Sequence, residues 1–314
     1  MRTPEPASVA PGVPPAGEGA SAPLAELLAG WSIEVTPRTL AKTPDLAGRL
    51  PAGTEVYLAH IAGTAVEEMG AAATRLAEAG VTVIPHLPAR VFPDGATFAA
   101  LVARYAGLGI RAALVLGGGT REAAGPFASA MDLLATGLFE AHGFRRIDIA
   151  GHPEGNRDID PDGGHRLADD ALLAKQNWAA TRGIEMKIVT QFVFEAEPVI
   201  AWAHRIAALG IRLPVRVGLA GPARLQTLIR YAIACGVGPS LRVLQGRAKD
   251  LSKLLLPFTP DAVASGLARH VATHGRLRDA ELSPCLIEGV HLFPLGGISA
   301  AIDWARERSA PAGS

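Results

Sequence analysis

The stretch Trp31-Ser32-Ile33-Glu34-Val35-Thr36-Pro37-Arg38-Thr39 alternates between apolar and polar side chains. Its odd-numbered residues from 31 to 35 are apolar, and the even-numbered ones carry one carboxylate, Glu34, between two hydroxyls. This period of two predicts a β-strand whose apolar side packs against a core. Pro37 is expected to end the strand, because a proline nitrogen cannot donate a hydrogen bond to a neighbouring strand.

The rest of the chain repeats an alternation of short apolar runs and helical patterns. Further strands are predicted at 55–59, 81–85, 112–116, 146–150, 186–191, 215–218 and 290–293. Helices are predicted at 24–28, 64–79, 97–108, 127–141, 167–181, 197–209, 225–235, 243–256, 260–270 and 299–308. Eight strands alternating with helices predict an α/β fold, a single (β/α)8 TIM barrel. An open doubly wound sheet is the alternative, but no Gly-x-Gly-x-x-Gly follows the first strand.

Composition argues against several classes of protein, such as nucleic-acid-binding and membrane-spanning proteins. The chain has 314 residues, 30 basic and 30 acidic, so no bulk charge attracts nucleic acid or an anionic membrane surface. No apolar run is long enough to cross a membrane, and residues 1–23, rich in Pro and Ala, lack the pattern of a signal peptide. We expect a disordered leader over 1–23, a catalytic barrel over 24–314, and a cytoplasmic location. Cys235 and Cys285 are predicted to be free thiols.

Polar residues collect where the predicted strands end. Glu34, His86, the glycines at 117–119, His152 with Glu154, and Gln191 all lie at or just after such an end. The chemistry of a TIM barrel is carried at that edge, so the pattern favours one shared site. Glu34 in an apolar barrel mouth would have a raised pKa, which suits a proton donor. The alternative is a structural glutamate paired with Arg38.

These residues carry a resemblance to the methylenetetrahydrofolate reductase family. The strand at 32–39, Pro85-His86-Leu87, Pro153-Glu154 and Val189-Thr190-Gln191-Phe192-Val193-Phe194 are similar to motifs of that family, in the same order. The likeness spans roughly residues 30 to 300. It implies a barrel that binds FAD, takes electrons from NADH or NADPH, and converts 5,10-methylenetetrahydrofolate to 5-methyltetrahydrofolate.

The resemblance also implies residue roles. Glu34 resembles the general acid that protonates N10 of the folate, and Gln191 the side chain that hydrogen-bonds the pterin. Arg38 is assigned with Gln191 to the folate substrate. The positions that the resemblance assigns to the cofactor are Ala59, His86, Gly117, Gly118, Gly119, His152, Glu154, Asn156, Asp170 and Lys175.

The sequence departs from the family at two of these places. The family usually shows Arg-Gly-Asp after strand four, where this chain has Gly117-Gly118-Gly119, and Ala59 replaces a threonine. Two interpretations follow: the site holds flavin differently, or hydride passes directly from nicotinamide to folate.

Several residues have plainer alternatives. Gln191 at a strand end can bond to backbone, His86 can be a structural histidine, and a glycine triplet can be a flexible turn. His152 and Glu154 lack a second histidine at helical spacing, so no metal site is predicted there. Residues 158–163 resemble the start of a calcium loop without its closing glutamate, and a solvated acidic loop is expected instead.

Two other classes of function stay open. A non-redox pterin- or folate-binding barrel would explain the missing Arg-Gly-Asp. A Schiff-base lyase would use Lys187, although that residue lies near the start of its strand, away from the mouth. The sequence leaves a homo-oligomer open.

Overall fold

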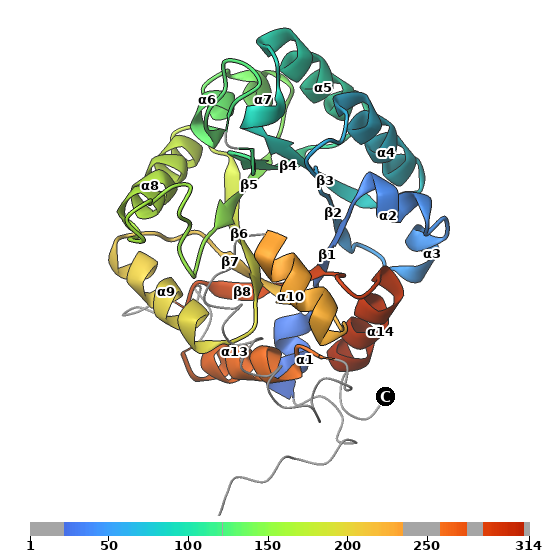
Figure 1. Ribbon diagram of the computed structural model, residues 1–314, viewed down its shortest axis with the longest axis vertical. Helices are drawn as coiled ribbons and strands as arrows, with labels where there is room; N and C mark the ends of the chain where they lie inside the picture. Colours follow the sequence, from blue (N-terminus) through green and yellow to red (C-terminus); the bar gives the residue numbers. More distant parts are fainter. Residues whose placement is uncertain (1–21, 121, 235–257, 275–284, 311–314) are drawn as a thin grey trace, which may run out of the picture.

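Eight parallel strands close into a barrel in chain order in the computed structural model, which describes residues 22–120, 122–234, 258–274 and 285–310. The strands are β1 (Ser32–Val35), β2 (Glu55–Leu58), β3 (Thr82–Pro88), β4 (Ala112–Leu116), β5 (Arg146–Gly151), β6 (Glu185–Val193), β7 (Val215–Ala220) and β8 (Ile287–Phe293). Figure 1 shows them as a central ring with helices around it. The predicted TIM barrel is confirmed.

One helix precedes the first strand, one follows the last, and the others lie in the connections between strands. They are α1 (Ala22–Leu28), α2 (Pro37–Ala41), α3 (Leu46–Arg49), α4 (Val66–Glu78), the short 3-10 helix η1 (Ala89–Val91), α5 (Gly95–Gly107), α6 (Ala130–Leu134), α7 (Leu138–Ala141), α8 (Arg166–Ala180), α9 (Glu197–Ala208), α10 (Leu225–Ala234), α13 (Asp261–His274) and α14 (Ile298–Ser309).

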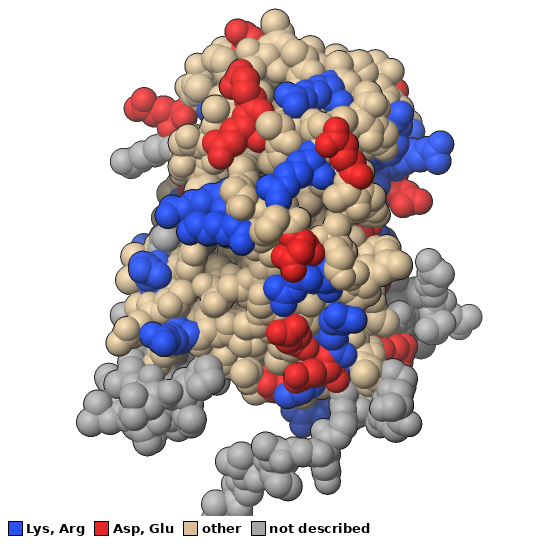
Figure 2. Space-filling view, turned by 90° about the vertical axis from the view of Figure 1, so that its right-hand side faces the viewer, with Lys and Arg blue, Asp and Glu red and all other residues tan. Residues whose placement is uncertain are grey.

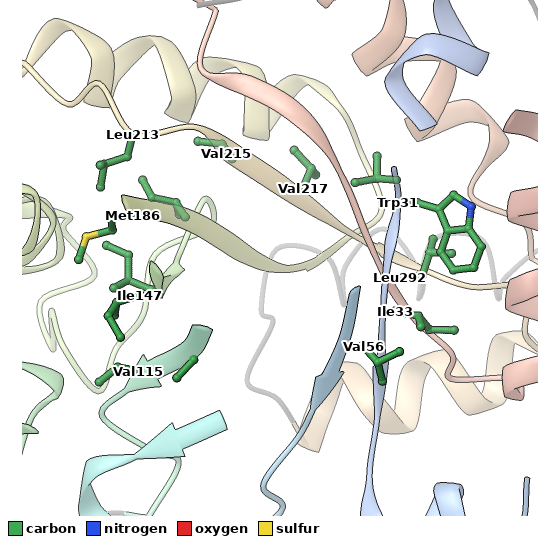
Figure 3. Packing of buried hydrophobic residues seen from close by; sticks show 14 of the residues in the cluster. Trp31, Ile33, Val56, Val115, Ile147, Met186, Leu213, Val215, Val217 and Leu292 are labelled. Carbon is green, nitrogen blue, oxygen red and sulfur yellow. The ribbon is translucent and has the colours of Figure 1, made fainter. Parts of the chain in front are cut away.

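The alternation in the first strand decides which side chains enter the barrel. Trp31, Ile33 and Val35 belong to the main core cluster between strands and helices, part of which is drawn in Figure 3. Because successive strand residues point to opposite faces, Ser32 and Glu34 point into the barrel. As expected, the strand stops before Pro37; the Thr36 side chain then caps α2, and Pro37 is its first residue.

Two bulges lie on the β6–β8 side of the barrel. The pairing of β6 with β7 runs from Val189↔Arg216 to Phe192↔Gly218, so β6 carries one extra residue around Gln191. The pairing of β7 with β8 similarly passes from Val215↔Ile287 to Arg216↔Gly289. A bulge re-aims the side chains beside it, and bulges are frequent next to active sites.

The helix predicted at 127–141 is wrong as a single element. Residues 130–141 form two short helices, α6 and α7, and Gly137 between them has φ 72°. A left-handed residue cannot continue a right-handed helix, so Gly137 divides the segment. The helix predicted to begin at Thr64 begins at Val66, with Ala65 at its N-cap and no side-chain cap.

Several predictions fall on residues that are not described. The leader at 1–21, the helix at 243–256 and Cys235 lie outside the described residues, whereas Ala22 and Pro23 open α1. Cys285 is a buried free thiol, as expected. Within the described ranges, no helix is both long and apolar enough to cross a membrane. On the face in Figure 2, basic and acidic side chains are largely interleaved.

Candidate active site

Glu34 lies at the carboxyl end of β1, inside the barrel mouth. Its Oε2 lies 3.7 Å from Nε2 of His86 on β3 and 3.9 Å from Nε2 of His291 on β8. Both separations exceed hydrogen-bonding distance, and 18% of the Glu34 side chain is exposed. The carboxyl therefore faces two imidazoles and remains reachable from the mouth. The alternative pairing of Glu34 with Arg38 is not among the ion pairs of the described residues, and Arg38 is exposed on α2.

Burial sets the protonation of this cluster. Burial raises the pKa of Glu34, and the neighbouring His86 opposes that shift only in part. Burial lowers the pKa of His86 to about 4 and that of His291 to about 3. Both imidazoles are therefore neutral at pH 7, so neither supplies a cation that would hold Glu34 ionised. The arrangement therefore favours the protonated form of Glu34 more than water would.

His291 is held on three sides. Register pairs Ser32 with His291, and the Ser32 Oγ lies 2.9 Å from Nδ1 of that ring. The rings of Tyr57 and Phe293 meet the imidazole edge-on, with centroids 4.6 and 4.9 Å away. The Ser32 contact fixes the ring orientation and leaves Nε2 directed to Glu34. Sequence reasoning missed His291, although a lone polar residue inside an apolar strand was the same signal that marked Glu34.

His86 carries a buried nitrogen with no hydrogen-bond partner among the described residues. That atom is Nε2, the one nearest Glu34. An orphaned buried polar atom costs free energy unless a ligand or water satisfies it. At the mouth of a barrel, this atom marks a place where a polar ligand group fits.

A network of charges fills the barrel below the mouth. Arg146 donates to Glu55 at 2.6 Å and lies 3.2 Å from Asp148, which accepts a 2.6 Å hydrogen bond from Tyr57. Tyr57 connects this network to His291 above it, through the ring contact already described. The network orients Tyr57 and so supports the mouth from below. It joins residues 91 apart in the chain, and no local pattern predicted it.

Gln191 lies at the bulge of β6, with its side chain partly buried. Its Oε1 accepts a 3.0 Å hydrogen bond from the backbone N–H of Phe192. For this oxygen, the plainer interpretation of Gln191 as a residue bonded to backbone is therefore correct. Thr190 supports the bulge, since its Oγ1 accepts from Gly218 N at 2.9 Å and donates to the Gln191 carbonyl at 2.8 Å. The amide nitrogen of Gln191 has no hydrogen bond among the described residues.

An apolar wall closes the mouth on the β6–β8 side. A second core cluster joins α10 to the carboxyl ends of these strands, and its members are Phe192, Phe194, Ala220, Ala223, Leu225, Leu228, Ala232, Phe258 and Phe293. Phe293 also touches His291. This buried cluster packs behind His291 and so helps to fix the position of its ring.

The glycine triplet forms an open loop after β4. A Cβ built on Gly117 or Gly119 would meet no atom within 4 Å, whereas one on Gly118 (φ 102°) would lie 3.2 Å from Pro88 Cβ. Arg90, which follows β3, holds this region through bonds to the Thr120 and Ala128 carbonyls and to Asp158 at 2.6 Å. Arg90 joins three βα loops, and sequence reasoning did not select it.

The acidic loop after β5 is largely solvated, as expected. Asp158 and Asp162 are exposed; Asp158 pairs with Arg90, and Asp162 accepts from Gly164 N. Asp160 is the exception, because it is buried and its carboxylate accepts from the N–H groups of Leu167 and Ala168 at the start of α8. That carboxylate therefore caps a helix.

The predicted cofactor residues of β5 and α8 separate into two groups. Burial, followed by the nearby Lys175, lowers the pKa of His152 to about 4. Burial lowers the pKa of Lys175 to about 8. Asn156 accepts from Asp158 N and lies 3.5 Å from the His152 ring nitrogen. Asp170, by contrast, is 63% exposed and paired with Arg166.

Two more of the positions assigned to the cofactor are Ala59 and Glu154. Ala59 is buried just after β2, where its backbone N–H donates to the Val35 carbonyl at 2.7 Å. Glu154 is partly buried in the β5 loop. Glu34 and His86 are thus brought together, whereas Arg38 and Asp170 lie on exposed surface.

The two buried histidines predict a pH dependence of stability. Their folded pKa values lie below the ordinary 6.5, so the unfolded chain binds more protons between about pH 4 and 6.5. Stability from these groups is complete above pH 6.5 and is lost as pH falls through that window. Denaturant unfolding at several pH values should show a shallower slope for His291→Gln than for wild type, by up to ~1.4 kcal/mol per pH unit. Equal slopes would contradict a neutral buried His291.

Comparison with known proteins adds little to this picture. No family model matches the chain. A solved structure described as Yersinia pestis DHPS with a pterine-sulfa conjugate is similar at 11% identity and a TM-score of 0.44, covering 91% of this chain and 96% of that chain. A D-psicose 3-epimerase solved in the presence of D-fructose is similar at 14% identity and a TM-score of 0.31, covering 86% of this chain and 89% of that chain. At these levels neither protein's ligand is transferred to this chain, and the function is inferred from the residues of the mouth.

Proposed function

We propose that this protein is an NAD(P)H-dependent reductase of 5,10-methylenetetrahydrofolate, with Glu34 as the proton donor. The observation that carries the proposal is the Glu34 carboxyl group, whose pKa is raised by burial beside two imidazoles that burial keeps neutral. Protonating a folate amine needs an acid that still holds its proton near neutral pH. The resemblance of the strand at 32–39 to the reductase family supports the choice of substrate.

The proposed reaction has two steps. Glu34 gives its proton to N10, the bond from N10 to the bridging carbon breaks, and an N5 iminium forms on the folate. Hydride from C4 of the reduced nicotinamide then adds to that carbon, giving the N5-methyl group and oxidised nicotinamide. Solvent returns a proton to Glu34 through the exposed side of its carboxyl. In this proposal His86 Nε2 and the Gln191 amide nitrogen, which form no hydrogen bond among the described residues, bind the polar edge of the pterin.

The residues at the positions assigned to FAD do not fit that group. Ala59 and Gly117 to Gly119 offer no polar side chain, and Asp170 faces solvent in an ion pair. Arg90, whose backbone N–H donates to the Gly117 carbonyl, is already bonded through its side chain to Asp158 and two carbonyls. The polar residues that remain in the set are His86, His152, Glu154, Asn156 and Lys175. Of these, Lys175 and His152 suit a phosphate of the nicotinamide nucleotide. We therefore propose direct hydride transfer and derive no step through a flavin.

Purified protein tests this proposal in one experiment. Its visible spectrum should lack a flavin band, and NADH or NADPH should be oxidised only after methylenetetrahydrofolate is added. The product should be 5-methyltetrahydrofolate, carrying deuterium when the nicotinamide is deuterated at C4. A stoichiometric flavin after extensive dialysis would contradict direct transfer, and absence of turnover with either nucleotide would contradict the reductase.

A non-redox pterin-binding barrel is the second candidate. The open glycine loop favours it, because the side chains that the family uses there are missing. In that case the folate would bind without nucleotide oxidation. The lyase is less well supported, since the Lys187 ammonium donates to Glu288 at 3.0 Å near the amino end of β6.

A further inference from the structure

Three histidines converge on the outside of the barrel, away from the mouth. His204 lies on α9, and His270 and His274 lie one turn apart on α13, a spacing that puts both on the same face of that helix. One ring nitrogen from each residue lies within 4.8 Å of the other two. Figure 1 shows α9 and α13 as neighbours in the outer ring.

The spacing of these nitrogens suits a tetrahedral metal ion. The Nε2 atoms of His204 and His270 are 3.3 Å apart. Zinc binds imidazole nitrogen at about 2.0–2.1 Å, so two ligands at a tetrahedral angle lie roughly 3.3–3.4 Å from each other. The third ring is close, with its centroid 4.2 Å from that of His270 and 5.7 Å from that of His204.

A second observation concerns the tautomer of His274. Its Nδ1 lies 3.0 Å from the backbone carbonyl of His270, and since a carbonyl only accepts, Nδ1 carries the hydrogen. In the neutral ring the lone pair then belongs to Nε2. Metal-binding histidines commonly use this arrangement, in which the second nitrogen donates to a carbonyl and fixes the ring.

The packing of α9 against α13 changes along the two helices. Near the start of α9 they approach closely, because a Cβ on Gly266 would lie 2.8 Å from that of Ala196. Two turns further along α9 the space between the helices is spanned by the imidazoles of His204 and His270. Within the described residues, these histidines form no ion pair with a carboxylate, so a cation is the partner that all three can share.

We propose that His204, His270 and His274 bind one divalent transition metal of the zinc class, which clamps α9 to α13. Imidazole ligands suit zinc, copper and nickel rather than magnesium or calcium. Helices of a TIM barrel run opposite to their strands, so these residues, late in their helices, lie toward the end of the barrel opposite Glu34. The metal is therefore a structural clamp and takes no part in the chemistry of the mouth.

Zinc chloride added to tag-free, full-length protein dialysed against chelator tests this site. Calorimetry should give one zinc per chain with a dissociation constant on the order of micromolar or tighter. At zinc concentrations about 100-fold above that constant, the thermal midpoint should rise by roughly 5 °C. Cobalt as a second probe should give the strong visible absorption of a four-coordinate ion.

Single variants locate the bound ion. His204→Ala, His270→Ala and His274→Ala should each weaken zinc binding by at least ~10-fold and abolish the cobalt spectrum. His142→Ala, a histidine beside α7 outside the cluster, should bind like wild type. Wild-type protein that takes up no zinc, or zinc uptake that survives His270→Ala unchanged, would overturn the proposal. Circular dichroism of each variant checks that the barrel is folded.

Discussion

Glu34→Gln should lower the rate of folate reduction by about 10²–10⁴-fold while folate binding stays within a few-fold of wild type. Glutamine keeps the size and a hydrogen-bonding amide, but it has no proton that it can transfer to N10. The loss should therefore appear in kcat more than in KM. Steady-state oxidation of NAD(P)H, with folate binding followed by calorimetry, separates the two effects.

Glu195→Gln is the matched control for this variant. Glu195 is an exposed carboxylate just beyond the carboxyl end of β6, so it lies on the side of the mouth but outside the buried cluster. Its replacement should leave turnover unchanged. Glu34→Gln should also be at least as stable as wild type, since it removes a carboxyl group that burial disfavours. If Glu34→Gln turned over at the wild-type rate, the assignment of Glu34 as the proton donor would be wrong.

Arg146→Ala should produce the largest loss of stability, about 3–5 kcal/mol. The arginine compensates Glu55 and Asp148 inside the barrel, where only 14% of its own side chain is exposed. Without it Asp148 stays fully buried without its ion-pair partner, and Glu55 keeps only the longer 3.6 Å contact with Arg216. The Asp148 carboxylate that accepts from Tyr57 also loses the cation that holds it in place. Urea unfolding of wild type and variant gives the difference directly.

Arg166→Ala provides the comparison for Arg146→Ala. Arg166 also pairs with an aspartate, but its side chain is 77% exposed and the partner, Asp170, is 63% exposed. Exposed pairs one helical turn apart contribute roughly 0.3–0.5 kcal/mol, so this variant should unfold near the wild-type midpoint. If both variants lost a similar free energy of unfolding, burial would not be what makes the loss of an arginine costly.

The sequence was sufficient for the barrel because each strand carries its own local signal. The alternation at 31–36 and the apolar runs of the later strands need only neighbouring residues, and the order of strands then follows from chain order. The helix at 127–141 failed because an apolar pattern does not reveal that Gly137 takes a left-handed conformation. Helix propensities of the individual residues therefore do not predict that the helix is broken at this glycine.

The candidate site was predictable only where a residue's position in its own strand was the signal. Glu34 and His86 sit at strand ends, where a barrel collects its chemistry, so position alone marked them. Ser32 with His291, and Tyr57 with Asp148, depend on pairings 259 and 91 residues apart that only closure of the barrel creates. Arg38 and Asp170 were assigned by position in the sequence motifs, which do not reveal that both side chains lie on the exposed surface.

The most direct test of the account is an infrared pH titration of the Glu34 carboxyl group, read as the difference between wild type and Glu34→Gln. We predict a protonated carboxyl signal that persists well above the ordinary glutamate pKa of about 4.3 and is missing from the variant. A Glu34 carboxyl that is already ionised at or below that ordinary value would contradict the proposed proton donor.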